Sequence, residues 1–279
     1  MITEKGNASG SAFKFPNTVY NAAGGYLSIC SGIKGYNVTV TNGAQSGLAS
    51  MAYAMSVLRS GQENAMLATG SDENSDTMTE LFGKLGVTSE NVVAPFAGKD
   101  GFVLSDGSAS VLIEDEKAAR ERGARIYCHA AGYGMAHSNV KFGTLTGSEA
   151  GLTNAVNNAL ADAGMTIDDI DAVFGFANGM KAVDDVEIKG LTAVFGDKLA
   201  EKPVVELKEV LGESRAAAAT TAAAHAALMF AGKIPSQEAY SIAADGSVSK
   251  TNVEASKLNN VLVVAYGAGG SYTAIVLSK

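Results

Sequence analysis

Two stretches of the chain repeat one layout, and this internal repeat limits the folds that are possible. Each stretch has a short apolar run, a glycine-containing turn with a serine, and a helix of small residues: VTVTNGAQSGLASMAYAMSVLRSGQ (38–62) and PVVELKEVLGESRAAAATTAAAHAALMFAGKIP (203–235). Two apolar runs joined through glycines follow each: DGFVLSDGSASVLIED (100–115) and VVAYGAGGSYTAIVLS (263–278). The sequence therefore predicts two copies of a β-α-β-β unit. Because small residues allow close approach, we expect both helices to lie between two sheets.

Runs rich in β-branched residues alternate with helical stretches along the whole chain, which indicates the α/β class. The expected strands cover residues 36–41, 64–70, 108–115, 124–134, 172–177, 203–208, 259–267 and 272–278. The expected helices cover residues 46–60, 147–164, 183–195 and 214–231.

The two halves, predicted at 1–122 and 123–279, are unequal. Before its repeat, the second half has two extra strands, 124–134 and 172–177, each followed by a helix. The first half has only about 35 residues in that place, and they contain one helix and no strand pair. The first half therefore lacks the counterparts of those strands.

Charge and composition exclude several classes of function. With a net charge of −8, neither nucleic acid nor an anionic membrane surface is expected as the main partner. The most apolar long stretch, 216–232, is mostly alanine and too weakly apolar to cross a bilayer. The two cysteines, Cys30 and Cys128, are expected to be free and buried. With no signal-peptide core at the start, the cytoplasm is the expected location. No spacing of His and Cys fits a metal site, and no phosphate-binding glycine loop precedes a helix, so no metal or cofactor is expected.

Five stretches resemble, in order, motifs of the β-ketoacyl synthases, the cysteine-dependent condensing enzymes of the thiolase superfamily. They are FPNTVYNAAGGYLSICSGIKGYNVTVTNGAQSGL (15–48), LRSGQENAMLATGSDE (58–73), PFAGKDGFVLSDGSASVLIED (95–115), DDVEIKGLTAVFG (184–196) and GAGGSYTAIVL (267–277). The resemblance implies a thiolase-like duplicated β-α-β-α-β-α-β-β layered fold with an incomplete first half. It also implies that the first strand of each half lies at the centre of its sheet, between the second and the fourth.

The reactive groups of that family are replaced here. Ala44 stands at the position of the nucleophilic cysteine, beside Gln45, and a methyl group cannot form a thioester. Asn178 and Glu213 stand where the family has its two histidines. The resemblance thus implies no catalytic residue in this chain.

The framework of the family site is retained. Glu187 and Lys208 match positions of its polar network, and a Lys208–Glu213 pair is expected because a buried ammonium needs a counter-charge. Asp184 and Asp185 are expected to cap the start of a helix, with Glu187 turned inward. The glycines of the family's strand turn remain, whereas its aromatic gate is an alanine: Gly267, Ala268, Gly269 and Gly270.

A framework without reactive groups is similar to the chain length factor, the inactive partner of type II polyketide ketosynthases. This similarity implies a heterodimer with an active ketosynthase in fatty acid or polyketide synthesis, with an acyl carrier protein as second partner. The contact would centre on 36–41, and helix 46–60 would line the chain pocket with Met51, Tyr53 or Met55. Two alternatives stay open. One is a malonyl-carrier-protein decarboxylase, or another acyl-processing enzyme, that uses Gln45, Asn178 and Lys208. The other is a structural, truncated ketosynthase fragment.

The strands missing from the first half have a structural consequence. Without them, 36–41 has no neighbour within its sheet, and 64–70 exposes an unpaired edge. We expect either that a separate polypeptide supplies the missing strands or that Met1 is not the natural start.

Overall fold

The computed structural model describes residues 14–92, 94–99, 101–141 and 147–279, and it divides into two compact units, Met1–Thr41 and Asn42–Lys279. The first unit contains η2 (Phe15–Thr18) and α2 (Ala22–Ser31). Residues 36–41 are irregular, so the strand predicted there is wrong. In the second repeat, the corresponding strand β5 (Val204–Val205) lies between two other strands. The described part of the first half has no strand ahead of 36–41 that could pair with it in the same way.

The second unit holds all the strands of the described residues. The helices of this unit are η3 (Gly43–Gln45), α3 (Ser46–Arg59), α4 (Asp76–Lys84), α5 (Glu116–Glu121), α6 (Glu149–Ala163), η4 (Ile167–Asp169), α7 (Lys181–Phe195), η5 (Gly196–Glu201), α8 (Lys208–Leu211), α9 (Ala216–Phe230) and η6 (Ala255–Lys257). The strands are β1 (Ala65–Asp72), β2 (Gly107–Glu114), β3 (His129–His137), β4 (Ala172–Phe174), β5, β6 (Ser236–Ile242), β7 (Val248–Glu254), β8 (Asn260–Gly267) and β9 (Ser271–Ser278).

The strands form two sheets. An antiparallel pair, β1–β2, is one sheet, and the other has seven strands in the order β3-β9-β8-β4-β5-β6-β7. In the larger sheet, β4 runs parallel to β5 and β8, and β9 runs antiparallel to β8 and β3. This order corrects the expectation for the half-sheet. Of the five strands predicted for the second half, the first, β3, lies beside the fifth, β9. The second, β4, lies between the third, β5, and the fourth, β8.

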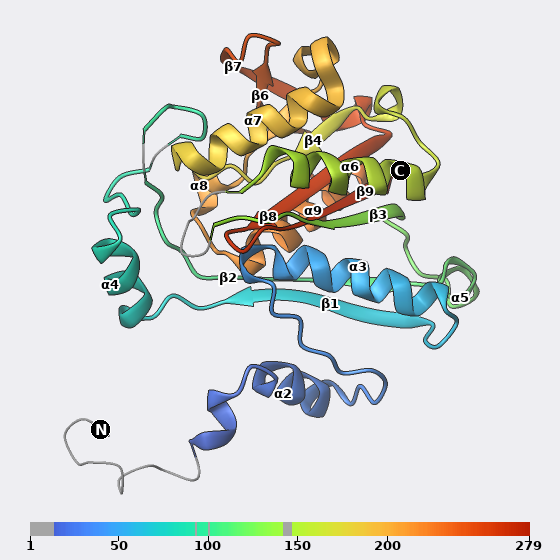
Figure 1. Cartoon of the computed structure of the whole chain (residues 1–279). Helices are drawn as coiled ribbons and strands as arrows, with labels where there is room; N and C mark the ends of the chain where they lie inside the picture. The colour runs from blue at the N-terminus through green and yellow to red at the C-terminus, as the bar shows by residue number, and fades with distance from the viewer. Residues whose placement is uncertain (1–13, 93, 100, 142–146) are drawn as a thin grey trace, which may run out of the picture. The chain divides into compact units, whose positions relative to one another are not determined.

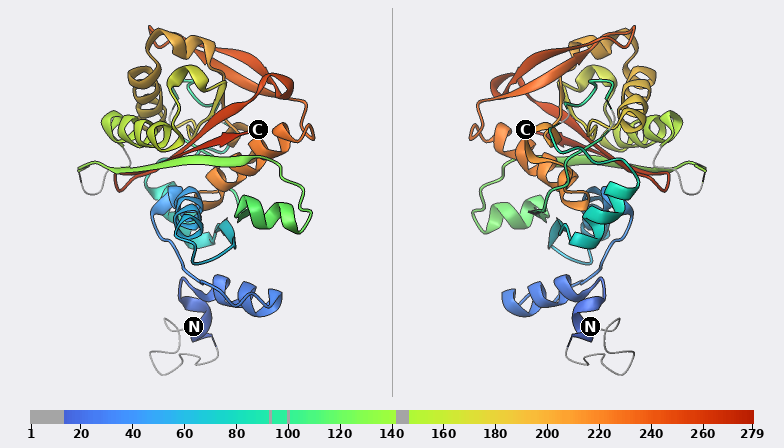
Figure 2. Two further views of the ribbon diagram at one scale, coloured as in Figure 1. Left: turned by 90° about the vertical axis from the view of Figure 1, so that its right-hand side faces the viewer. Right: turned by 90° about the vertical axis from the view of Figure 1, so that its left-hand side faces the viewer.

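Helices α3 and α9 lie between the two sheets, as the repeat predicted (Figures 1 and 2). Both helices contact β1 and β2 on one side and β9 on the other, while α6 packs on the far side of the larger sheet and α7 packs on α6. Close packing in the middle layer depends on glycine. A Cβ at Gly47 of α3 or at Gly70 of β1 would lie 2.2 or 2.4 Å from the carbonyl oxygen of Ala216 on α9.

Most of the predicted elements are present, with shifted ends. The strand predicted at 124–134 is β3 and begins at His129, and the strand predicted at 203–208 is only the two-residue β5. The hairpin β6–β7 joins the larger sheet through β5 and was not predicted. Among the described residues, no helix has both the length and the apolar character that a membrane span requires.

Candidate functional site

The site lies where two parallel strands end. Because β4 and β5 run parallel, their carboxyl ends meet at the same edge of the sheet, where ligands of α/β folds commonly bind. Asn178 follows β4, and Lys208 begins the short helix α8 that follows β5. The two side chains line a pocket of about 120 Å³ together with Glu213 and with residues from 92–105 and 209–212.

Lys208 and Glu213 form a buried ion pair, as predicted. The Lys208 Nζ donates to Glu213 Oε2 at 2.8 Å and to the Phe176 carbonyl oxygen at 3.0 Å, and it lies 3.1 Å from the centre of the Phe176 ring. The two side chains are 6% and 5% exposed, so the pair is shielded from solvent. Glu213 Oε2 also accepts from Asn178 Nδ2 at 2.8 Å, and Oε1 accepts from the Arg215 backbone N–H at 2.8 Å. Three donors, one of them charged, therefore hold this carboxylate.

Behind this pair lies a second pair of acidic side chains, Glu187 and Glu206, which face each other across Gly175. A Cβ at position 175 would lie 1.9 Å from Glu206 Oε1 and 2.2 Å from Glu187 Oε1. Glu187 Oε2 accepts from the Phe176 backbone N–H at 2.7 Å and from the Tyr266 hydroxyl at 3.3 Å. Glu187 Oε1 and both oxygens of Glu206 are buried without a donor. An ionised carboxylate can only accept, so a bond between the two groups requires a proton on one of them.

The surroundings of Glu206 favour a proton on this group. Burial raises the pKa of Glu206 well above its usual value, and the charge of nearby Glu187 raises it further. As a protonated acid, Glu206 can donate to Glu187. The structure confirms the prediction that Glu187 turns inward, whereas the role of Glu206 was not predicted. The available signal was a carboxylate directly after the apolar pair of β5.

Asp184 anchors the loops around the site and does not cap α7. The helix begins at Lys181, and its N-cap, Met180, makes no side-chain cap bond. The buried Asp184 carboxylate instead accepts from the backbone N–H groups of Phe96, Asn178 and Gly179 at 2.7, 3.0 and 3.2 Å. Burial raises the pKa of Asp184 to about 6, against the opposing effect of these bonds. The predicted cap is therefore wrong for Asp184, and Asp185 instead pairs with Lys181 at 2.6 Å.

The turn that opens α3 carries Ala44 and Gln45, as predicted. Gln45 is fully buried; its Oε1 accepts from the Thr273 hydroxyl, and its Nε2 has no acceptor. The end of β8 lies against this turn, since a Cβ at Gly267 would lie 3.2 Å from the Asn42 carbonyl oxygen. None of the hydrogen bonds among the described residues joins Gln45 to Asn178, Lys208 or Glu213. The structure thus brings together Asn178, Lys208, Glu213 and, behind them, Glu187, and it places Gln45 in a separate network.

The predicted strand turn is also present. The Gly270 N–H donates to the Gly267 carbonyl oxygen at 3.0 Å, and Gly270 has a φ of 81°, which favours glycine. Ala268 and Gly269 form the exposed tip. A methyl group at 268 leaves this tip without the aromatic gate that the resemblance implies.

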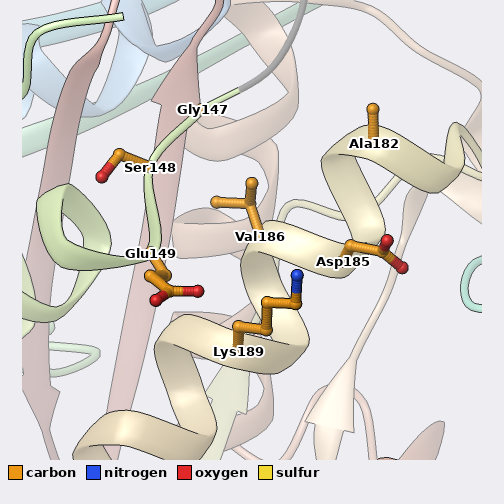
Figure 3. Close-up of a pocket in the computed structure, with 7 residues that line it drawn as sticks. All are labelled: Gly147, Ser148, Glu149, Ala182, Asp185, Val186 and Lys189. Atoms are coloured by element: carbon orange, nitrogen blue, oxygen red, sulfur yellow. The ribbon is translucent and has the colours of Figure 1, made fainter.

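A larger pocket, of about 520 Å³, lies elsewhere, between the start of α6 and the side of α7. Its lining residues are Gly147, Ser148, Glu149, Ala182, Asp185, Val186 and Lys189 (Figure 3). The pocket contains none of the predicted site residues. In the described part of the chain, no three His, Cys, Asp or Glu side chains are grouped as metal binding would require.

Sequence profiles of the β-ketoacyl synthase family match most of the chain. The N-terminal domain of the family matches residues 1–119, and the C-terminal domain matches residues 127–240. A relative is the 3-oxoacyl-[acyl-carrier-protein] synthase 2 of Vibrio cholerae, which is 29% identical over 204 residues, covering 70% of this chain. The chain spans about half the length of that relative (49%).

Solved structures have the same fold. A ketosynthase/chain length factor, named for ishigamide, matches with a TM-score of 0.84 and 23% identity over 94% of this chain and 65% of its own. A type II polyketide synthase acyl-carrier protein in complex with its ketosynthase matches with a TM-score of 0.85 and 20% identity over 98% of this chain and 70% of its own. The fold is thus thiolase-like, and the chain belongs to the β-ketoacyl synthase family.

Proposed function

We propose that this chain is a non-catalytic ketosynthase-like subunit of the chain length factor type. It pairs with an active β-ketoacyl synthase and shapes the pocket for a fatty acid or polyketide chain that an acyl carrier protein delivers. The cytoplasm remains the expected location. The Glu213 carboxylate carries the proposal, since it stands where the family resemblance implies a histidine and already accepts from three donors. These bonds occupy both oxygens of the carboxylate with donors of this chain.

The described residues that line the Asn178–Lys208–Glu213 pocket include no cysteine. Ala44 offers only a methyl group, and Cys128 is not among the residues that line the Asn178–Lys208–Glu213 pocket. Burial raises the pKa of Cys128 to about 11, so its thiol stays protonated near neutral pH. Cys30 is exposed on α2, which corrects the expectation that it is buried.

The comparisons support the proposal at the level of the fold. The matched structures include one described as a ketosynthase/chain length factor and one with an acyl-carrier protein. In a heterodimer with an active subunit, a chain that retains a pocket and lacks its reactive groups can still contribute to the shape of the acyl-chain pocket.

Acyl loading tests the proposal. The purified chain is incubated with an acyl thioester of carrier protein, alone and with an active ketosynthase from the same source, and both are measured by intact mass spectrometry. We expect the acyl mass on the ketosynthase only, together with co-elution of the two chains. An acyl adduct on this chain, or no complex with any ketosynthase of that source, would contradict the proposal.

One observation favours the decarboxylase alternative. The buried Gln45 Nε2 has no acceptor, and a free amide N–H could bind the oxygen of an enolate. Release of carbon dioxide from malonyl-carrier protein by the chain alone, lost in Gln45→Ala and kept in a control such as Gln237→Ala, would establish this activity. The first proposal expects no release from any of the three proteins.

A further inference from the structure

The two β-β pairs of the internal repeat can be compared residue by residue. In each pair, two eight-residue strands run antiparallel, and the first ends opposite the start of the second: Asp72 pairs with Gly107, and Gly267 pairs with Ser271. Counted from those ends, Leu67 of β1 corresponds to Leu262 of β8, and Leu112 of β2 corresponds to Val276 of β9. By the same count, the residues of β1 and β2 that point toward α3 and α9 correspond to the residues of β8 and β9 that point toward these helices.

In the second repeat, the outer face of the pair is covered. Leu262 and Val276 are fully buried, and α6 packs on β9 and β3. Both edges are paired as well. β4 runs parallel to β8 along Val261–Val263, and β3 runs antiparallel along the whole of β9.

In the first repeat, the same surfaces are open. Leu67 and Leu112 lie directly opposite each other and are 38% and 54% exposed. Among the described residues, no further strand pairs with β1 or β2. The described residues ahead of Asn42 contain helices but no strand that could fill either edge.

The edges of β1 and β2 lack the usual protection against pairing. Exposed edge strands commonly carry lysine, proline or a bulge that prevents other strands from adding to them. The sequences AMLATGSD (65–72) and GSASVLIE (107–114) contain neither residue, and their register is continuous over all eight pairs. Charge occurs only at the ends, on Asp72 and Glu114, and both are held by arginines of this chain. These are features of strands inside a sheet.

We propose that the β1–β2 sheet is a docking surface for a β-α-β segment of a second polypeptide. One strand of this segment runs parallel to β1 along Met66–Ala68, as β4 does on β8, and another runs antiparallel to β2, as β3 does on β9. An amphipathic helix between them covers Leu67 and Leu112, as α6 covers its own sheet. The proposal concerns a surface apart from the Glu213 pocket and holds whether or not that pocket is catalytic.

Hydrogen–deuterium exchange on the full chain tests the proposal, because it reports each strand separately. The probe, added in trans, is the part of the Vibrio cholerae relative outside its matched region, which is about half of that protein. We expect the probe to slow exchange at least tenfold in both β1 and β2. Leu112→Lys should abolish that protection, whereas Leu81→Lys on α4, where leucine is also about half exposed (48%), should leave it unchanged.

Three outcomes would overturn the proposal. One is the absence of protection with the probe, and another is protection that Leu112→Lys leaves intact. The third is protection that rises with the concentration of the chain alone, since this would identify a second copy as the occupant. None of these readouts depends on acyl transfer, so they separate this proposal from the one for the Glu213 pocket.

Discussion

Glu206 and Glu187 face each other across Gly175, and three of their four carboxylate oxygens are buried without a donor. Such a pair is stable only when a proton is shared between the two groups, because two ionised carboxylates at this distance repel each other and neither can donate. The remaining oxygen, Glu187 Oε2, is fixed by the Phe176 N–H and the Tyr266 hydroxyl. A proton, and not a second cation beside Lys208, therefore neutralises one carboxylate of the Glu187–Glu206 pair.

The shared proton predicts that stability falls as pH rises. The folded chain keeps the proton on Glu206 above pH 4.5, the usual pKa of this group, where the unfolded chain has lost it. The free energy of unfolding should therefore decrease from about pH 4.5 upward. Glu206→Gln supplies an amide donor that does not titrate, so this decrease should become shallower. Urea unfolding at several pH values measures it, with the exposed Glu80→Gln as control; equal slopes in the two variants and the parent chain would exclude the shared proton.

Gly175 leaves room for the acidic pair, so adding one methyl group at this position should lower the free energy of unfolding substantially. Gly175→Ala places a Cβ 1.9 Å from Glu206 Oε1, so the core must shift. We expect a loss of stability of about 1–3 kcal/mol. The double variant Gly175→Ala/Glu206→Ala should recover part of this loss, because it removes the group that the methyl meets. Denaturant unfolding of the two single variants and the double variant gives the coupling energy; simple additivity would mean that the strain has another source.

The Lys208–Glu213 pair predicts strong coupling between its two members. Lys208→Met leaves the Glu213 carboxylate buried without its counter-charge, which should cost about 3–5 kcal/mol. Lys208→Met/Glu213→Met removes both charges and should be much less destabilised than the sum of the single variants. A double-mutant cycle by denaturant unfolding measures the difference. If the single change Lys208→Met cost less than about 1 kcal/mol, the pair would behave as an exposed one.

The features that the sequence predicted correctly depend on local pattern and internal repetition. Helices 46–60 and 214–231 were found from their small-residue composition, and their place between the two sheets followed from the repeat. The Lys208–Glu213 pair followed from the rule that a buried ammonium requires a carboxylate. The helices and the ion pair follow from residues that lie close together in the chain, and the layer follows from comparing the two copies of the repeat.

The features that the sequence predicted wrongly depend on neighbours that are distant in the chain or absent from the described residues. Residues 36–41 have the composition of a strand, but a strand also needs a neighbouring strand for its backbone, and no strand of the described residues forms a ladder with them. Asp184 precedes most of its helix in the sequence, yet it bonds the backbone of Phe96, which is far away in the chain. The Glu187–Glu206 pair joins α7 to the end of β5, which no local pattern indicates. The division of the chain into halves at residue 122 remains a prediction.

Helix α3 carries buried residues that support the core and an exposed tyrosine. Of the three candidates for measuring chain length, Met51 and Met55 are each 3% exposed and pack in the core, whereas Tyr53 is 37% exposed. Tyr53→Ala should therefore change the length of the product made by a complex with an active ketosynthase, while the free energy of unfolding changes by less than about 1 kcal/mol. Met55→Ala is the matched change on the buried face and should cost about 2–5 kcal/mol. Mass spectrometry of the acyl products and denaturant unfolding of both variants measure the two effects. An unchanged product with a stable Tyr53→Ala complex would place the chain-length wall elsewhere than on α3.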